Sequence, residues 1–169
     1  GSWRGGSRES GFLELSGTVR GDVHDLLDGV VLSPSLKVLL GRGATTLEGV
    51  VGSSVSPPGL SDLFFQEGVL AEANPELAPE RVRDEVSVEL RRRFGGASWS
   101  ATTGVTAFRA DVEGMILWLP DHRFVWSPEN VDVRRRGVEA AGELRAGPVT
   151  SLRGSVSWTE VEYGAPALE

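Results

Sequence analysis

Cysteine is absent from this chain of 169 residues, and lysine occurs only as Lys37. The lack of cysteine excludes disulfide bonds, thiol catalysis and cysteine-ligated zinc, so packing must hold the fold together. No uninterrupted apolar run approaches the roughly 18 residues that a membrane-spanning helix needs, and the first residues contain no apolar signal-peptide core. From these absences we expect a cytoplasmic protein that does not associate with a membrane.

Acidic residues outnumber basic ones, and the formal net charge is -7. General nucleic-acid binding relies on net positive charge or a strong basic stripe, so this balance argues against it. Two isolated histidines, His24 and His122, lack the spacing of a metal site. We therefore expect no metal and no cofactor.

The length and an apolar content of 40% are typical of one globular domain. Glycine, serine and arginine dominate residues 1–11. We expect a flexible N-terminal arm over residues 1–11, a single domain over residues 12–163 and a flexible tail over residues 164–169.

Hydrophobic spacing predicts alternating strands and helices. The strands are expected over residues 12–19, 44–51, 68–71, 97–103 and 114–119, with a hairpin partner at 122–126 and one or two edge strands within 149–163. The helices are expected over residues 23–31, 33–43, 60–66, 79–94 and 129–144. This order predicts an α/β fold, namely a single-domain three-layer α/β/α sandwich with a mixed sheet and extra edge strands at the termini.

The segment after Pro79 gives the clearest helix signal. Val82, Val86 and Leu90 recur at a spacing of four and would form a buried stripe. Acidic residues precede the arginines of this segment, which suits the helix dipole.

A small hydroxylated tract follows, from Ala101 to Val105. In open α/β sheets, ligands bind just beyond the carboxyl ends of strands, so Thr102, Thr103 and Gly104 are candidate ligand-binding residues. The alternative interpretation is that these threonines are β-formers that close a strand before a glycine turn.

Several ordered blocks resemble the C-terminal domain of the competence/damage-inducible CinA family, the nicotinamide-nucleotide amidase. The blocks lie at residues 58–64, 68–71, 78–95, 101–105, 114–119 and 133–141. The resemblance covers about half of the chain. It implies hydrolysis of the carboxamide of nicotinamide mononucleotide, and a homo-oligomer.

The catalytic position departs from the pattern of that family. Gly49 stands where the family places its nucleophilic serine, and it supplies no hydroxyl group. We therefore assign no catalytic residue, and expect a catalytically impaired or inactive CinA C-terminal-like domain that acts as a nucleotide-binding, regulatory or assembly module. The alternative is an active nicotinamide-nucleotide amidase with Ser53 or Ser54 as a displaced nucleophile. A third alternative is a structural or partner-binding protein outside this family.

Retained nucleotide binding would use the hydroxylated tract and one arginine. Thr102, Thr103 and the Gly104 amide would contact a phosphate or ribose, and Arg134 would neutralise phosphate charge. The expected partners are a pyridine nucleotide and either a second copy of the chain or another protein.

Overall fold

The computed structural model describes residues 1–7, 10–27, 29–64, 68 and 70–164. Strands account for most of these residues, and α1 is a single short helix among them. The elements are β1 (Ser2–Ser7), β2 (Gly11–Val23), β3 (Val30–Arg42), β4 (Thr45–Ser56), α1 (Leu60–Phe64), β5 (Glu80–Gly95), β6 (Trp99–Pro120), β7 (Trp126–Ala146) and β8 (Thr150–Tyr163).

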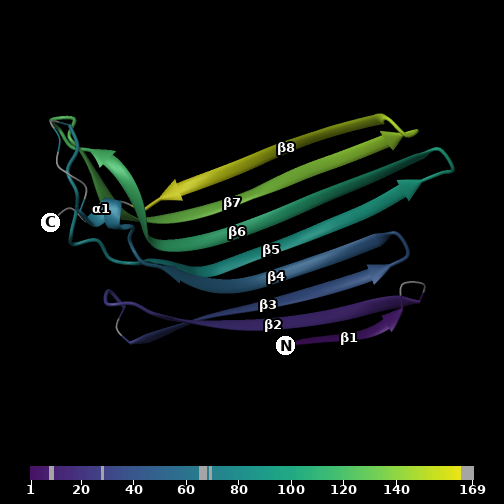
Figure 1. The fold of residues 1–169 in the computed structure, drawn as a ribbon, viewed down its shortest axis with the longest axis horizontal. Helices are drawn as coiled ribbons and strands as arrows, with labels where there is room; N and C mark the ends of the chain where they lie inside the picture. The colour runs from purple at the N-terminus through teal and green to yellow at the C-terminus, as the bar shows by residue number, and fades with distance from the viewer. Residues whose placement is uncertain (8–9, 28, 65–67, 69, 165–169) are drawn as a thin grey trace.

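The strands form one sheet in the order of the sequence, from β1 at one edge to β8 at the other. Every neighbouring pair is antiparallel. Figure 1 shows the strands side by side in a single layer, with α1 beside the far end of the β6–β7 hairpin. The sheet is therefore a meander whose two edge strands lie far apart.

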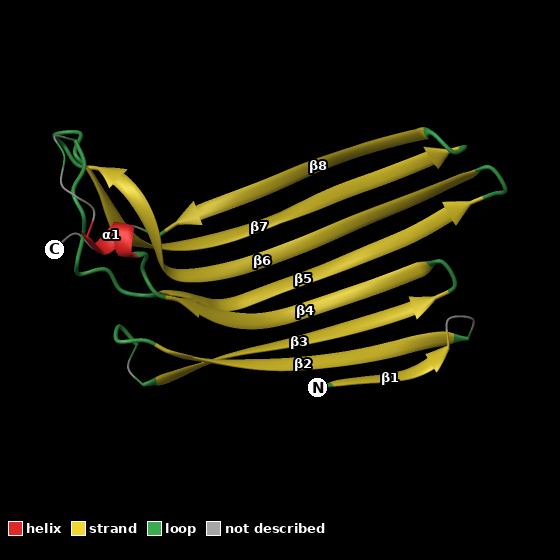
Figure 2. Cartoon of the chain, in the orientation of Figure 1, coloured by secondary structure: helices red, strands yellow, loops and turns green. Residues whose placement is uncertain are grey.

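The two ends of the sheet carry connections of different length. Short turns at residues 43–44, 96–98 and 147–149 join strands at one end, and Gly43 and Gly147 adopt positive φ angles of 57° and 64° there. At the other end, residues 57–79 form a long connection from β4 to β5 that includes α1. Figure 2 shows this contrast between the short-turn end and the long-loop end.

The long connection is anchored to the β6–β7 hairpin. Trp118 donates its indole N–H to Asp62 at 3.1 Å, and Asn74 donates to the Pro128 carbonyl at 3.0 Å. Ala71 forms a parallel bridge with Trp126. These contacts hold Asp62, Ala71 and Asn74 of the long connection against the part of the hairpin that extends beyond β5.

Few side chains are buried, because a single sheet has no second layer to cover it. The buried apolar residues in the described chain are Leu27, Val55, Leu63, Leu77, Ala110, Val112, Val131 and Val133, with Pro128 fully enclosed. Leu63 and Leu77 belong to the long connection, and most of the others lie toward the long-loop end. Among the described residues, no helix is long and apolar enough to cross a membrane.

The predicted three-layer α/β/α sandwich with a mixed sheet is wrong, since the sheet is a single antiparallel layer. The segments predicted as helices over residues 33–43, 79–94 and 129–144 lie in β3, β5 and β7. The predicted strands at 12–19, 44–51 and 114–119 are confirmed as parts of β2, β4 and β6. A short helix also forms within the predicted range 60–66, of which residues 65 and 66 lie outside the described residues.

The spacing of four residues explains the error in β5. Four is a multiple of two, so Val82, Val86 and Leu90 repeat with the period of a strand as well as with that of a helix. Val88 lies between Val86 and Leu90 and alternates with Ser87, and this alternation indicates a strand. The neighbouring strands supply the backbone hydrogen bonds that select the extended form.

Candidate functional site

The register of the sheet divides its side chains between two faces. Directly opposed residues on antiparallel strands point to the same side, and successive residues along a strand alternate. We call the side that carries Leu47 and Leu90 the apolar face, and the side that carries Glu48 and Glu89 the polar face.

Apolar side chains form continuous rows across the apolar face. One row consists of Leu40, Leu47, Leu90, Val105, Ala140 and Val156. The next row toward the long-loop end consists of Val38, Gly49, Val88, Ala107, Val138 and Trp158. β2 continues both rows through Leu13 and Leu15. The apolar face thus extends over seven consecutive strands.

These apolar side chains are exposed rather than packed. Leu90 is 50% exposed, Val105 is 47% exposed and Val156 is 69% exposed. Contiguous exposed apolar patches of more than a few hundred Å² mark contacts with membranes or partner proteins. The apolar face is therefore a surface that requires a covering.

The apolar area runs obliquely to the rows. On β3 it spans Val30 to Leu40, whereas on β8 it spans Leu152 to Trp158. The row beyond Trp158 is charged on β6 to β8, yet on β3 the same row holds Leu36. The boundary of the apolar area therefore crosses the strands at an angle.

A group of charged residues borders the apolar area on β6 to β8. We call it the charged belt: Arg109, Asp111, Arg134, Arg136, Glu160 and Glu162. Asp111 accepts from Arg109 and Arg134, both at 2.6 Å. Arg136 pairs with Glu160 at 3.0 Å. The belt lies on the same side of the sheet as Trp158 and just beyond it.

The polar face carries hydroxyl, carboxylate and guanidinium groups on the same strands. Lys37 Nζ lies 2.8 Å from Glu48, and Arg91 Nη2 lies 2.7 Å from Glu89. Arg153 pairs with Glu143 at 3.1 Å.

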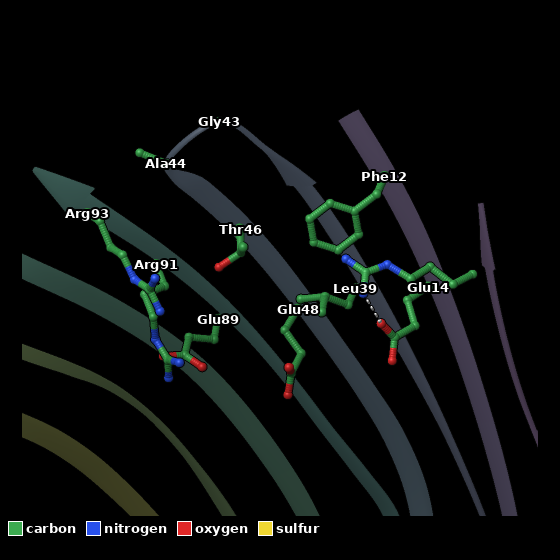
Figure 3. A pocket seen from close by; sticks show the side chains of 11 residues that line it. Phe12, Glu14, Leu39, Gly43, Ala44, Thr46, Glu48, Glu89, Arg91 and Arg93 are labelled. Atoms are coloured by element: carbon green, nitrogen blue, oxygen red, sulfur yellow. Dashed lines mark hydrogen bonds and ion pairs between the residues drawn. The ribbon is translucent and has the colours of Figure 1, made fainter. Parts of the chain in front are cut away.

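A cavity of about 340 Å³ opens on this face near the short-turn end. Its lining residues are Arg4, Phe12, Glu14, Leu39, Gly43, Ala44, Thr46, Glu48, Glu89, Arg91 and Arg93. Figure 3 shows Glu14, Glu48 and Glu89 with the arginines around this space. The polar face is thus charged and hollowed by an open cavity, opposite a face that is apolar.

The predicted ligand residues do not converge. Thr102 and Gly104 lie on the polar face, whereas Thr103 lies on the apolar face opposite Gly142. Arg134 belongs to the charged belt, eight residues from Gly142 along β7. The structure does not bring Arg134 to the tract, and the binding role of these four residues stays a prediction.

The residues considered for catalysis are also dispersed. Gly49 lies in the middle of β4 on the apolar face, and Ser53 and Ser54 lie at a register shift near the end of that strand. No cluster of three metal-ligating side chains occurs in the part of the chain that the structure describes.

The β6–β7 turn contains one strongly perturbed carboxylate. Asp121 accepts from the Val125 amide at 2.9 Å and from the Arg123 side chain at 2.9 Å. These hydrogen bonds lower the pKa of Asp121 to about 2. The carboxylate therefore closes a turn, which is a structural role.

Comparisons with known proteins point to transporters. The chain is 30% identical over 133 residues to the vitamin B12 transporter BtuB of Vibrio vulnificus (strain CMCP6), an alignment that covers 78% of this chain and 20% of BtuB. The chain thus spans about a fifth of the length of this curated relative. In its fold it is similar to the structure of the copper transporter OprC, with a TM-score of 0.50, 18% identity, and coverage of 90% of this chain and 25% of OprC. No protein-family profile matches the chain.

These similarities overturn the family assignment made from the sequence. The CinA resemblance is wrong, and so is the interpretation as an impaired or active nicotinamide-nucleotide amidase, because the chain is an antiparallel sheet similar to transporters. The predictions of a cytoplasmic location and of no membrane association are contradicted by the same similarities. A pyridine-nucleotide partner has no support in them.

A sequence signal for the two faces was present. The stretch from Val86 to Leu90 alternates apolar and polar residues, and the stretch from Val156 to Trp158 does the same. Glycine and alanine at other positions of the apolar face, such as Gly49 and Ala140, weaken the alternation of apolar and polar residues within any single strand.

Proposed function

We propose that this chain forms part of the wall of an outer-membrane β-barrel transporter. The apolar face contacts lipid, and the polar face lines the interior of the barrel. The separation of exposed apolar and polar side chains on opposite sides of one antiparallel sheet carries this proposal.

The length of the apolar stretches supports the assignment. The stretches Leu13–Val23 on β2, Val30–Leu40 on β3 and Trp99–Ala107 on β6 each measure roughly 9 to 11 residues, which is what a tilted strand needs to cross the hydrocarbon core. Arg42 and the charged belt lie outside these stretches.

The oblique boundary supports it independently. Strands of a closed barrel tilt by about 35–45° from the barrel axis, so a horizontal lipid layer crosses them obliquely. Leu36 and Glu160 share one row of the sheet but fall on opposite sides of the boundary, as this tilt requires.

The connections suggest an orientation. Outer-membrane barrels have short periplasmic turns and longer extracellular loops. The short turns at 43–44, 96–98 and 147–149 then face the periplasm, and the anchored segment 57–79 faces the exterior.

The edges of the sheet require further strands. Unpaired backbone groups are costly in hydrocarbon, so a spanning sheet must close on itself. β1 and β8 are the edge strands here, and the chain spans 20% of the transporter that it resembles. We infer that additional strands of a larger barrel pair with both edges.

The names of the two similar transporters specify a vitamin and a metal ion as their cargo. We propose that this chain serves the passage of a small nutrient of that kind along its polar face.

Quenching of tryptophan fluorescence by brominated lipid tests the lipid contact. One variant keeps Trp158, on the apolar face, as its single tryptophan, and a matched variant keeps Trp126, beyond the charged belt. In each variant, phenylalanine replaces the remaining tryptophans. In phosphatidylcholine vesicles brominated on the acyl chains, we expect strong quenching of Trp158 and little quenching of Trp126. Equal quenching of the two tryptophans, or none of either, contradicts the proposal.

A further inference from the structure

We propose that Arg109 and Arg136 in the charged belt bind phosphate groups of lipid headgroups. This inference rests on the proposed function, because it places the belt at the surface of the bilayer. It adds a binding surface for one chemical group of the lipid.

The position of the two arginines carries the first step. Arg109 and Arg136 are directly opposed on β6 and β7, in the row that follows Ala107, Val138 and Trp158. They are the first charged side chains beyond the apolar area on these strands. An arginine there lies where lipid phosphates begin, beside an indole at the depth that membrane proteins favour for tryptophan.

The order of charges carries the second step. The inner row of the belt has Arg109 and Arg136 with Glu160, so its formal charge is positive. The next row outward has Asp111 and Glu162 with Arg134, and Asp84 opposite Asp111, so its formal charge is negative. Positive charge next to the apolar area and negative charge farther out suit a layer of phosphate at the bilayer surface.

The pairing of the two arginines carries the third step. Like charges directly opposite each other destabilise a strand pair. Asp111 offsets the charge of Arg109 only in part, because the same carboxylate also pairs with Arg134, whereas Glu160 pairs with Arg136. Arg109 donates a hydrogen bond from one guanidinium nitrogen to Asp111, and Arg136 donates from two nitrogens to Glu160. A guanidinium has five N–H donors, and the side chains of Arg109 and Arg136 are 59% and 55% exposed. A phosphate between them would accept donors from both strands.

The test uses the whole chain and three kinds of vesicle. These contain phosphatidylcholine alone, phosphatidylcholine with phosphatidic acid, and phosphatidylcholine with oleate at the same surface charge. Binding is measured by flotation as the ratio of the partition coefficients for anionic and neutral vesicles. The double variant Arg109→Gln with Arg136→Gln is compared with Arg91→Gln with Arg135→Gln, which removes two arginines from the polar face.

We expect the wild-type chain to prefer phosphatidic acid over both other compositions. Each arginine near an anionic surface contributes about a fivefold change in partition, so the belt variant should lose roughly 25-fold of this preference, and the polar-face control should lose little. No preference in the wild type, an equal preference for oleate, or equal losses in both double variants overturns the inference. Binding to neutral vesicles with quenching of Trp158 would still hold in those cases, which separates this failure from failure of the proposed function.

Discussion

Replacement of Val105 by arginine tests the placement of the apolar face in lipid. Val105 lies on β6 opposite Leu90 and Ala140, and it is 47% exposed. The charged belt begins four residues farther along the strand at Arg109, about 13 Å away at the rise of a strand. An arginine at position 105 cannot extend that far, so its charge would remain in hydrocarbon.

The expected cost follows from this depth. An arginine on the lipid face near the midplane destabilises a membrane β-barrel by about 2–4 kcal/mol. That energy corresponds to a loss of roughly 30-fold to several hundred-fold in the folding equilibrium. In a chain whose apolar face contacted water, the same change would remove an exposed apolar side chain and cost almost nothing.

The neighbouring residue provides the control. Thr106 is adjacent in sequence but lies on the polar face, in the row of Glu89 and Glu139. Thr106→Arg adds the same side chain on the same strand and should fold nearly as the wild type does. Because the sheet alone leaves β1 and β8 unpaired, the assay is equilibrium folding into phosphatidylcholine vesicles of the urea-unfolded proposed barrel that includes this chain, followed by circular dichroism.

The comparison between the two variants decides the result. Val105→Arg should require a much lower urea concentration to fold than either Thr106→Arg or the wild type. If both arginine variants fold alike, or if Thr106→Arg is the more damaging, then the apolar face does not contact lipid and the proposed wall is wrong.

Two further predictions concern the long-loop end. Asn130→Ala removes hydrogen bonds to the amide and the carbonyl of Ala78, at 2.8 and 3.0 Å, and to the Gly114 carbonyl at 2.7 Å. Each bond contributes about 1 kcal/mol, so limited proteolysis within residues 57–79 should be faster in the variant. Unchanged cleavage would show that the other contacts are sufficient to hold this segment. The pKa of Asp121 is lowered from 3.8 to about 2. The ionised carboxylate therefore stabilises the turn fully above pH 3.8, and this stabilisation is lost as the pH falls through about 2. Carboxyl NMR titration should follow this step, Asp121→Asn should abolish it, and a normal midpoint would refute the hydrogen bond from Val125.

The sequence predicted individual strands better than their arrangement. The strand at 114–119 is a continuous apolar run, and the strand at 12–19 is rich in apolar residues, so both were predicted correctly. The segments of β5 and β7 are rich in arginine and glutamate, which are good helix formers, so local propensity favoured the wrong structure. Only pairing with adjacent strands, which is not local in sequence, makes their extended form favourable.

The absence of a long apolar run led to a wrong prediction of location. Such a run indicates a spanning helix, whose whole length must be apolar. A spanning strand needs apolar residues only at alternate positions, as at Val86, Val88 and Leu90, so half of its residues can be polar, as in an ordinary soluble strand. The charge of -7 and the absence of cysteine are compatible with both kinds of protein.

The small core and the exposed apolar face have one physical explanation. A water-soluble sheet buries one face against a second layer, yet the described residues between 57 and 79 cover only the hairpin end of this sheet. Burial of apolar area contributes about 25 cal/mol per Å², so the stability that a core would supply must come from covering the apolar face. Lipid on that face and further strands at β1 and β8 would supply it together. On the proposed placement in a barrel wall, the native sheet should therefore be most stable where both are present.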